Sequence, residues 1–152
     1  MSAEEAFQTL KSFFETRQSA RQAMGAIKEG IEISVVIGGT VDCALFRQGH
    51  QPIVEARAAR TPDVVFHIRP ESVYVLNQTK DEIGDVGVNI LKEILAGNIS
   101  VKVPGKFLNI ISRGYLDMIR QGGAPVAGYL ARHGFGSVPK IISTIKQMKK
   151  SG

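Results

Sequence analysis

The stretch from Leu95 to Lys106 constrains the fold most, because the spacing of its apolar residues changes twice within it. Before it, apolar residues recur at helical spacing, at Ile83, Val86, Ile90, Leu91, Ile94 and Leu95. Gly97 suits a helix C-terminus, and Ile99, Val101 and Val103 then alternate with polar residues, as in a strand. After Pro104-Gly105, helical spacing returns at Phe107, Leu108, Ile111, Tyr115, Met118 and Ile119. The pattern predicts one strand with an apolar face between two helices.

The other predicted elements suggest an α+β layer fold. The capping pair Ser2 and Glu5 opens an N-terminal helical region that ends at Gly30. The predicted strands are Ile31–Ile37, 41–46, Ile53–Ala59 and Asp63–Arg69, with a tight turn at Gly38-Gly39 and a helix at Pro70–Gln78. Because four strands follow one another and the fifth comes late, we expect an antiparallel sheet covered by helices, with the fifth strand beside or at the edge of the others.

Size and composition predict one domain over residues 1–152. No run of eighteen apolar residues is present, so no membrane span is expected, and the N-terminus lacks the pattern of a secretion signal. The single cysteine, Cys43, permits no internal disulfide. Together these features favour a cytoplasmic protein.

The positive charge is concentrated near the C-terminus. Of 19 basic and 14 acidic residues, six basic and no acidic residues lie from Met118 onward, so the excess belongs to a basic helical tail, residues 121–152. Ser137 could cap a last amphipathic helix, in which lysines lie off an aliphatic stripe. The tail is either an ordinary solvated helix or a contact with an anionic membrane or a partner enzyme. The residues predicted for that contact are Lys140, Lys146, Lys149 and Lys150.

Three stretches, in this order, resemble the sterol carrier protein type-2 family of lipid-binding domains. They are the hairpin from Ile31 to Phe46, the strand within 61–68 (Thr-Pro-Asp-Val-Val-Phe-His-Ile), and the segment Leu95–Lys106. The last is similar to the family pattern Leu-x-Gly-x-Ile-x-Val-x-x-Gly. The resemblance covers about residues 7–120, and the tail after Gln121 departs from it. It implies a five-stranded, mostly antiparallel sheet covered on one face by helices and enclosing an apolar tunnel.

The resemblance also implies a function without catalysis, namely binding and transfer or presentation of a sterol, fatty acyl or isoprenoid chain. It implies no cofactor other than a bound lipid. The residues predicted to line the lipid slot are Phe66, Ile68, Ile94, Ile99, Val101, Phe107, Leu108, Ile111 and Tyr115. Each could instead belong to an ordinary hydrophobic core. The alternative function is an accessory or scaffold module that docks partner enzymes of lipid or quinone metabolism.

Other chemistry finds little support in the residues. The three histidines are scattered, so no metal site is expected, and no phosphate-binding glycine loop is present. Cys43 on an apolar strand face is typical of a buried cysteine rather than a nucleophile, and Asp63 is typical of a turn. An enzyme that uses Cys43 or His67 is therefore a weak alternative. The basic tail lacks a nucleic-acid recognition motif, so no nucleic-acid partner is expected.

Overall fold

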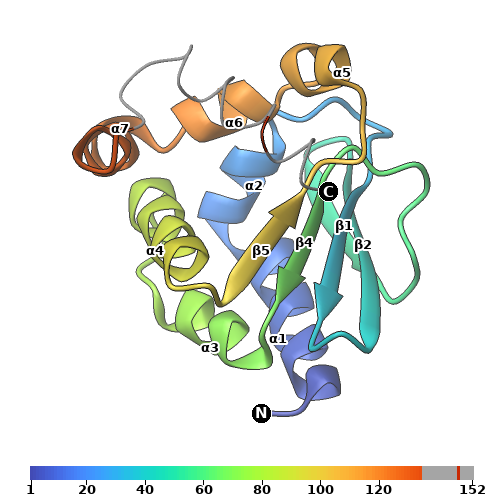
Figure 1. Ribbon diagram of the computed structural model, residues 1–152. Coiled ribbons are helices and arrows are strands. Elements are labelled where there is room, and N and C mark those ends of the chain that lie inside the picture. Colours follow the sequence, from blue (N-terminus) through green and yellow to red (C-terminus); the bar gives the residue numbers. More distant parts are fainter. Residues whose placement is uncertain (135–146, 148–152) are drawn as a thin grey trace.

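The computed structural model describes residues 1–134 and residue 147 (Figure 1). Its helices are α1 (Ala3–Thr16), α2 (Gln18–Met24), α3 (Pro70–Gln78), α4 (Ile83–Leu95), α5 (Phe107–Ser112), α6 (Tyr115–Arg120) and α7 (Gly123–Arg132). Its strands are β1 (Ile33–Ile37), β2 (Val41–Gln48), β3 (Gln51–Glu55), β4 (Val65–Ile68) and β5 (Ile99–Lys102).

The strands form one five-stranded sheet in the order β3-β2-β1-β4-β5. β1 pairs antiparallel with β2, β2 with β3, and β4 with β5, whereas β1 and β4 run parallel. Helices α1, α2 and α4 contact the sheet, α1 and α2 toward β3 and α4 at β5 (Figure 1). The predicted α+β class, with a mostly antiparallel sheet and the late strand at an edge, is confirmed.

Local sequence signals explain where several elements begin and end. Ser2 caps α1, with its hydroxyl accepting the backbone N–H of Glu5 at 3.1 Å. The turn residues Gly38 and Gly39 both have positive φ, 60° and 73°, as a tight hairpin of this type requires. The helix predicted at Pro70–Gln78 is found with those bounds. β3 lies at Gln51–Glu55 rather than at Ile53–Ala59, because the pairing with β2 runs from Gln48 opposite Gln51 to Ala44 opposite Glu55.

The helical segment after β5 is broken in two, where the apolar spacing predicts one helix. Gly114, at the break, has φ of 98°, a left-handed conformation that ends α5 and redirects the chain into α6. The break lies where the segment meets the loop after α2, since the backbone N–H of Lys28 donates to the carbonyl of Arg113 at 3.2 Å. α5 and α6 therefore point in different directions (Figure 1).

Helix α7, beyond the part of the chain that carries the family resemblance, packs against α4. Two glycines of α4 allow this close approach. A Cβ atom on Gly87 would lie 2.6 Å from the Val126 side chain, and one on Gly84 would lie 3.0 Å from Pro125. In the described part of the chain, no helix is long and apolar enough to cross a membrane.

Candidate functional site

The inner, helix-facing side of the sheet is covered unevenly. One row of side chains runs across four paired strands, from Cys43 through Val35 and Phe66 to Val101. Cys43 and Val35 are buried, with exposed fractions of 0% and 6%, whereas Phe66 and Val101 are only half-buried. The helices therefore seal the β2–β1 side of this row and leave its β4–β5 side partly open.

Partly buried apolar residues of α4 and α6 also pack against the core cluster, and α4 contacts β5. We define the β4–β5 apolar surface as Phe66, Val101, Ile90, Ile94 and Met118, all half-buried and packed against the core cluster. Ile90 and Ile94 lie one turn apart on α4, and Met118 comes from α6. β5 is an edge strand of the sheet, and α4 contacts it.

The structure divides the nine residues predicted to line a slot into three groups. Ile68, Ile99 and Tyr115 are buried in the core cluster. Phe66, Ile94 and Val101 belong to the β4–β5 apolar surface, and Phe107 is also half-buried. Leu108 and Ile111 instead face solvent, with exposed fractions of 74% and 41%. A lining role for the set as a whole stays a prediction.

The prediction that Leu108 and Ile111 line a slot expected both side chains to be covered. Their exposure has a geometric cause. Helix α5 is oriented by Asn109 and Arg113, which both hydrogen-bond to Asp63, and the side chain turned inward is Ile110, only 2% exposed. Residues three or four apart share a helix face, so these tethers leave Leu108 and Ile111 outside.

Asp63 connects two stretches that carry the family resemblance. Its carboxylate, only 4% exposed, accepts hydrogen bonds from Arg113 Nη1 at 3.0 Å and from the Tyr115 hydroxyl at 3.3 Å. Its backbone carbonyl accepts the N–H of Gly105 at 3.1 Å. Burial and the negative charge of Asp63 raise the pKa of Tyr115. Asp63 thus ties the segment after β5 to the strand it precedes, a role the sequence did not reveal, because Arg113 lies fifty residues away.

A pocket of about 320 Å³ opens at this junction. Its lining comprises Thr61, Pro62, Asp63, Pro104, Gly105, Lys106, Asn109 and Arg113. Thr61 has φ of 41°, a conformation that costs a non-glycine residue some strain. The Asp63 carboxylate is neutralised by Arg113, which leaves Lys106 to give the pocket a net positive charge.

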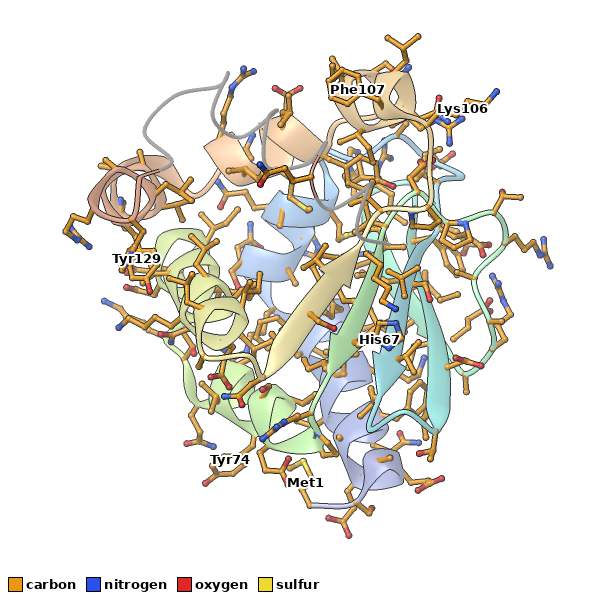
Figure 2. All side chains as sticks on the ribbon, viewed as in Figure 1. Met1, His67, Tyr74, Lys106, Phe107 and Tyr129 are labelled. Carbon is orange, nitrogen blue, oxygen red and sulfur yellow. The ribbon has the colours of Figure 1, made fainter. Side chains whose placement is uncertain are left out.

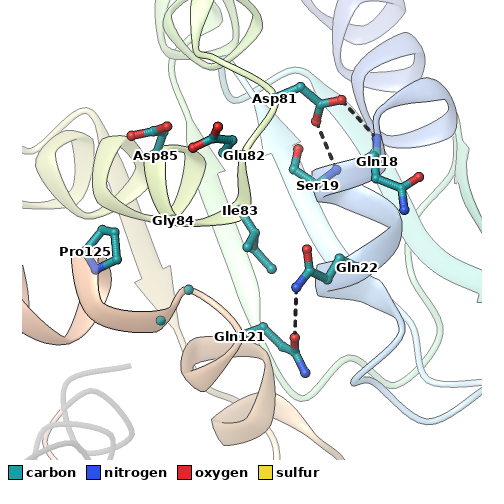
Figure 3. Close-up of a pocket in the computed structure, with 12 residues that line it drawn as sticks. Gln18, Ser19, Gln22, Asp81, Glu82, Ile83, Gly84, Asp85, Gln121 and Pro125 are labelled. Carbon is teal, nitrogen blue, oxygen red and sulfur yellow. Dashed lines mark hydrogen bonds between the residues drawn. The ribbon is translucent and has the colours of Figure 1, made fainter.

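A second pocket, of about 410 Å³, lies between α2, the start of α4 and the α6–α7 turn (Figure 3). Gln22 donates to Gln121 across it at 3.2 Å. Asp81 accepts the backbone N–H groups of Ser19 and Gln18 at 2.9 and 3.2 Å and so caps α2. Hydrogen bonds from Ser19 lower the pKa of Asp81. Both pockets are open to solvent, and none of the nine predicted slot residues lines either of them.

Within residues 1–134 and 147, no group of three or more histidine, cysteine or acidic side chains is placed to hold a metal ion. The four lysines predicted for membrane or partner contact lie outside the described residues, as does the predicted last helix. The absence of catalysis stays a prediction.

Cys43 is fully buried, and burial, together with the charge of Asp42, raises the pKa of its thiol to about 11. Because the thiolate is the reactive form, we expect the folded protein to resist a disulfide reagent at mildly alkaline pH and the unfolded protein to react rapidly. Absorbance of the released thiol anion, with and without guanidinium, measures both rates. Rapid labelling of the folded protein would contradict the interpretation of Cys43 as a buried, unreactive thiol and would make it a candidate nucleophile.

The comparisons with known proteins found similarity only among solved structures. No family model and no curated protein matches this chain. A solved structure titled "UbiJ-SCP2 Ubiquinone synthesis protein" is similar. The similarity covers 76% of this chain and 90% of that one, with 14% sequence identity and a TM-score of 0.45. Its title contains the name of the family that the sequence motifs resemble. The ubiquinone synthesis named in this title is a property of that protein.

Proposed function

We propose that this protein binds a lipid chain, without chemical change to it, against the β4–β5 apolar surface, and transfers or presents it. The observation that carries the proposal is the uneven cover of the inner sheet face. Phe66 and Val101 continue the row of Cys43 and Val35, yet they are only half-buried. Helices α1 and α2 cover the same face of the sheet near its β3 edge. A bound alkyl chain would cover that face near the β5 edge.

The energetics of such a site favour a carrier. Burial of an alkyl chain contributes about 0.8 kcal/mol per methylene, so a chain of roughly sixteen carbons gains about 13 kcal/mol before costs. A bilayer offers nearly the same gain. The protein therefore needs only to match the affinity of the membrane for the chain, and a half-buried surface next to α4 permits both entry and release.

Lipid binding is tested with the whole purified chain. Native mass spectrometry and solvent extraction should reveal a co-purified lipid, and a fluorescent fatty acid should bind. We expect Ile94→Asn and Val101→Asn to weaken that binding by about tenfold each, because each places an amide against the alkyl chain. Both positions are half-buried, so melting temperatures should show that the variants fold.

The matched control is Val75→Asn on α3, which changes an exposed valine away from the proposed surface and should leave binding unchanged. A protein that takes up no lipid, or variants at Ile94 and Val101 that bind as well as the wild type, would refute the proposal.

The alternative is an accessory module that docks partner enzymes of lipid or quinone metabolism. It has one supporting feature, the basic tail from residue 121 onward, which could serve as a docking arm. Partner enzymes that co-purify with the full chain and are lost when 137–152 are deleted, while lipid binding persists, would favour this role over simple transfer.

A further inference from the structure

Helix α5 exposes two large aliphatic side chains at one extremity of the molecule. Leu108 is 74% exposed, the largest fraction among the exposed large hydrophobic residues of the described chain, and Ile111 is 41% exposed. They lie three residues apart and so share a face of the helix. Figure 2 shows the neighbouring Phe107 and Lys106 at the outer end of the molecule, opposite Tyr74 and Met1.

The surroundings of this face are basic. From Ile94 to Leu116 the chain carries Lys102, Lys106 and Arg113 and no acidic residue. Lys106 immediately precedes α5, and Lys102 ends β5 on the approach to it. Lys28 adds a further positive charge, since its backbone N–H bonds to the carbonyl of Arg113 at the end of α5.

Acidic groups near α5 cancel only part of this charge, because Asp63 offsets Arg113 and leaves Lys102 and Lys106. Asp63 is buried and paired with Arg113, and Glu29, next to Lys28, lies 3.7 Å from Arg47. The pocket beside α5, which Lys106 helps to line, therefore opens with a positive side chain at its rim.

We propose that the α5 face, defined as Leu108 and Ile111 together with Lys106 at the start of α5 and Lys102 at the end of β5, docks the protein on an anionic membrane surface. The two aliphatic side chains enter the boundary between headgroups and acyl chains, and the lysines contact anionic headgroups. Exposed aliphatic side chains next to lysines favour an anionic lipid surface over a purely apolar partner, because such a partner offers nothing to the lysines. The proposal stands independently of the lipid-binding surface between β4, β5 and α4.

The chain contains no tryptophan, which permits a direct test. A Leu108→Trp variant carries a single reporter at the proposed docking point, and a Tyr74→Trp variant carries one at the opposite end of the molecule. With vesicles that contain phosphatidylglycerol, we expect the emission of the first variant to shift to shorter wavelength and that of the second to stay unchanged. Vesicles of phosphatidylcholine alone should shift neither spectrum.

Vesicle co-sedimentation of the full chain gives the second measurement. The double variant Leu108→Ser, Ile111→Ser should weaken binding by more than tenfold, because two aliphatic side chains no longer leave water. Lys106→Gln should weaken it about fivefold, and this loss should shrink at high salt. Both changes are at exposed positions, so folding should be preserved.

Three results would overturn the proposal. They are no binding to anionic vesicles, equal binding to vesicles of phosphatidylcholine alone, or binding in which the Leu108→Trp spectrum does not change. The last result would assign membrane contact to another part of the chain, which deletion of residues 137–152 would then test.

Discussion

Replacement of Asp63 by alanine should destabilise the protein by about 3 kcal/mol and lower its melting temperature by about 10 °C. The carboxylate is buried and accepts hydrogen bonds from Arg113 and Tyr115. Its removal leaves the guanidinium of Arg113 and the buried hydroxyl of Tyr115 without this partner. Arg113 is one-third exposed, so water compensates part of the loss, and we expect the cost to stay below that of a fully buried charge.

Differential scanning calorimetry on three variants separates this contribution from a general effect of charge removal. Asp117→Ala breaks the ion pair with Arg120, in which both side chains are about 60% exposed, and should cost less than about 1 kcal/mol. Tyr115→Phe removes only the hydroxyl and should cost about 1 kcal/mol. If Asp63→Ala melts within a degree or two of Asp117→Ala, Asp63 does not anchor the segment after β5.

Replacement of Gly114 by alanine should cost about 3 kcal/mol or more, measured by urea denaturation. Two effects add. The φ of 98° is unfavourable for any residue with a Cβ atom, and that atom would lie 1.9 Å from the carbonyl oxygen of Ala26. The loop after α2 would have to move away from the α5–α6 junction.

Gly97→Ala is the matched control. Gly97 also has positive φ, 82°, but a Cβ atom there meets nothing within 4 Å. Its cost should therefore be the conformational strain alone, about 1 to 2 kcal/mol. Equal destabilisation by the two substitutions would mean that the contact between Gly114 and Ala26 contributes nothing, and that the junction of α5 and α6 is not tightly packed.

The two substitutions bear on the proposed membrane contact, because Asp63 and Gly114 fix the direction in which α5 points. Asn109 and Arg113 tether α5 to Asp63, and Gly114 turns the chain away after it. The exposure of Leu108 is a consequence of both.

Much of the architecture could be predicted from local patterns. Alternation of apolar residues predicted β1, β4 and β5, the Gly38-Gly39 turn predicted the hairpin, and Pro70 predicted the start of α3. These features depend on residues near one another in the chain, where side-chain period and backbone preference act directly. The order of elements also sufficed for the α+β class.

The rest depended on contacts between residues distant in the chain. Helical spacing from Phe107 to Ile119 is the same whether the segment forms one helix or two, and only its meeting with the loop after α2 placed the break at Gly114. Likewise, Leu108, Ile110 and Ile111 are all apolar, and the tether of Asn109 and Arg113 to Asp63 decides that Ile110 turns inward.

The sequence by itself thus determined most of the elements, the class of sheet and the resemblance to a lipid-binding family, but neither the bounds of β3 nor the break between α5 and α6. Only the tertiary structure decided which apolar residues are sealed in the core, which remain half-covered beside β5, and which face solvent on α5. The physical reason is that periodicity records how a segment can be buried, whereas actual burial depends on which neighbours pack against it.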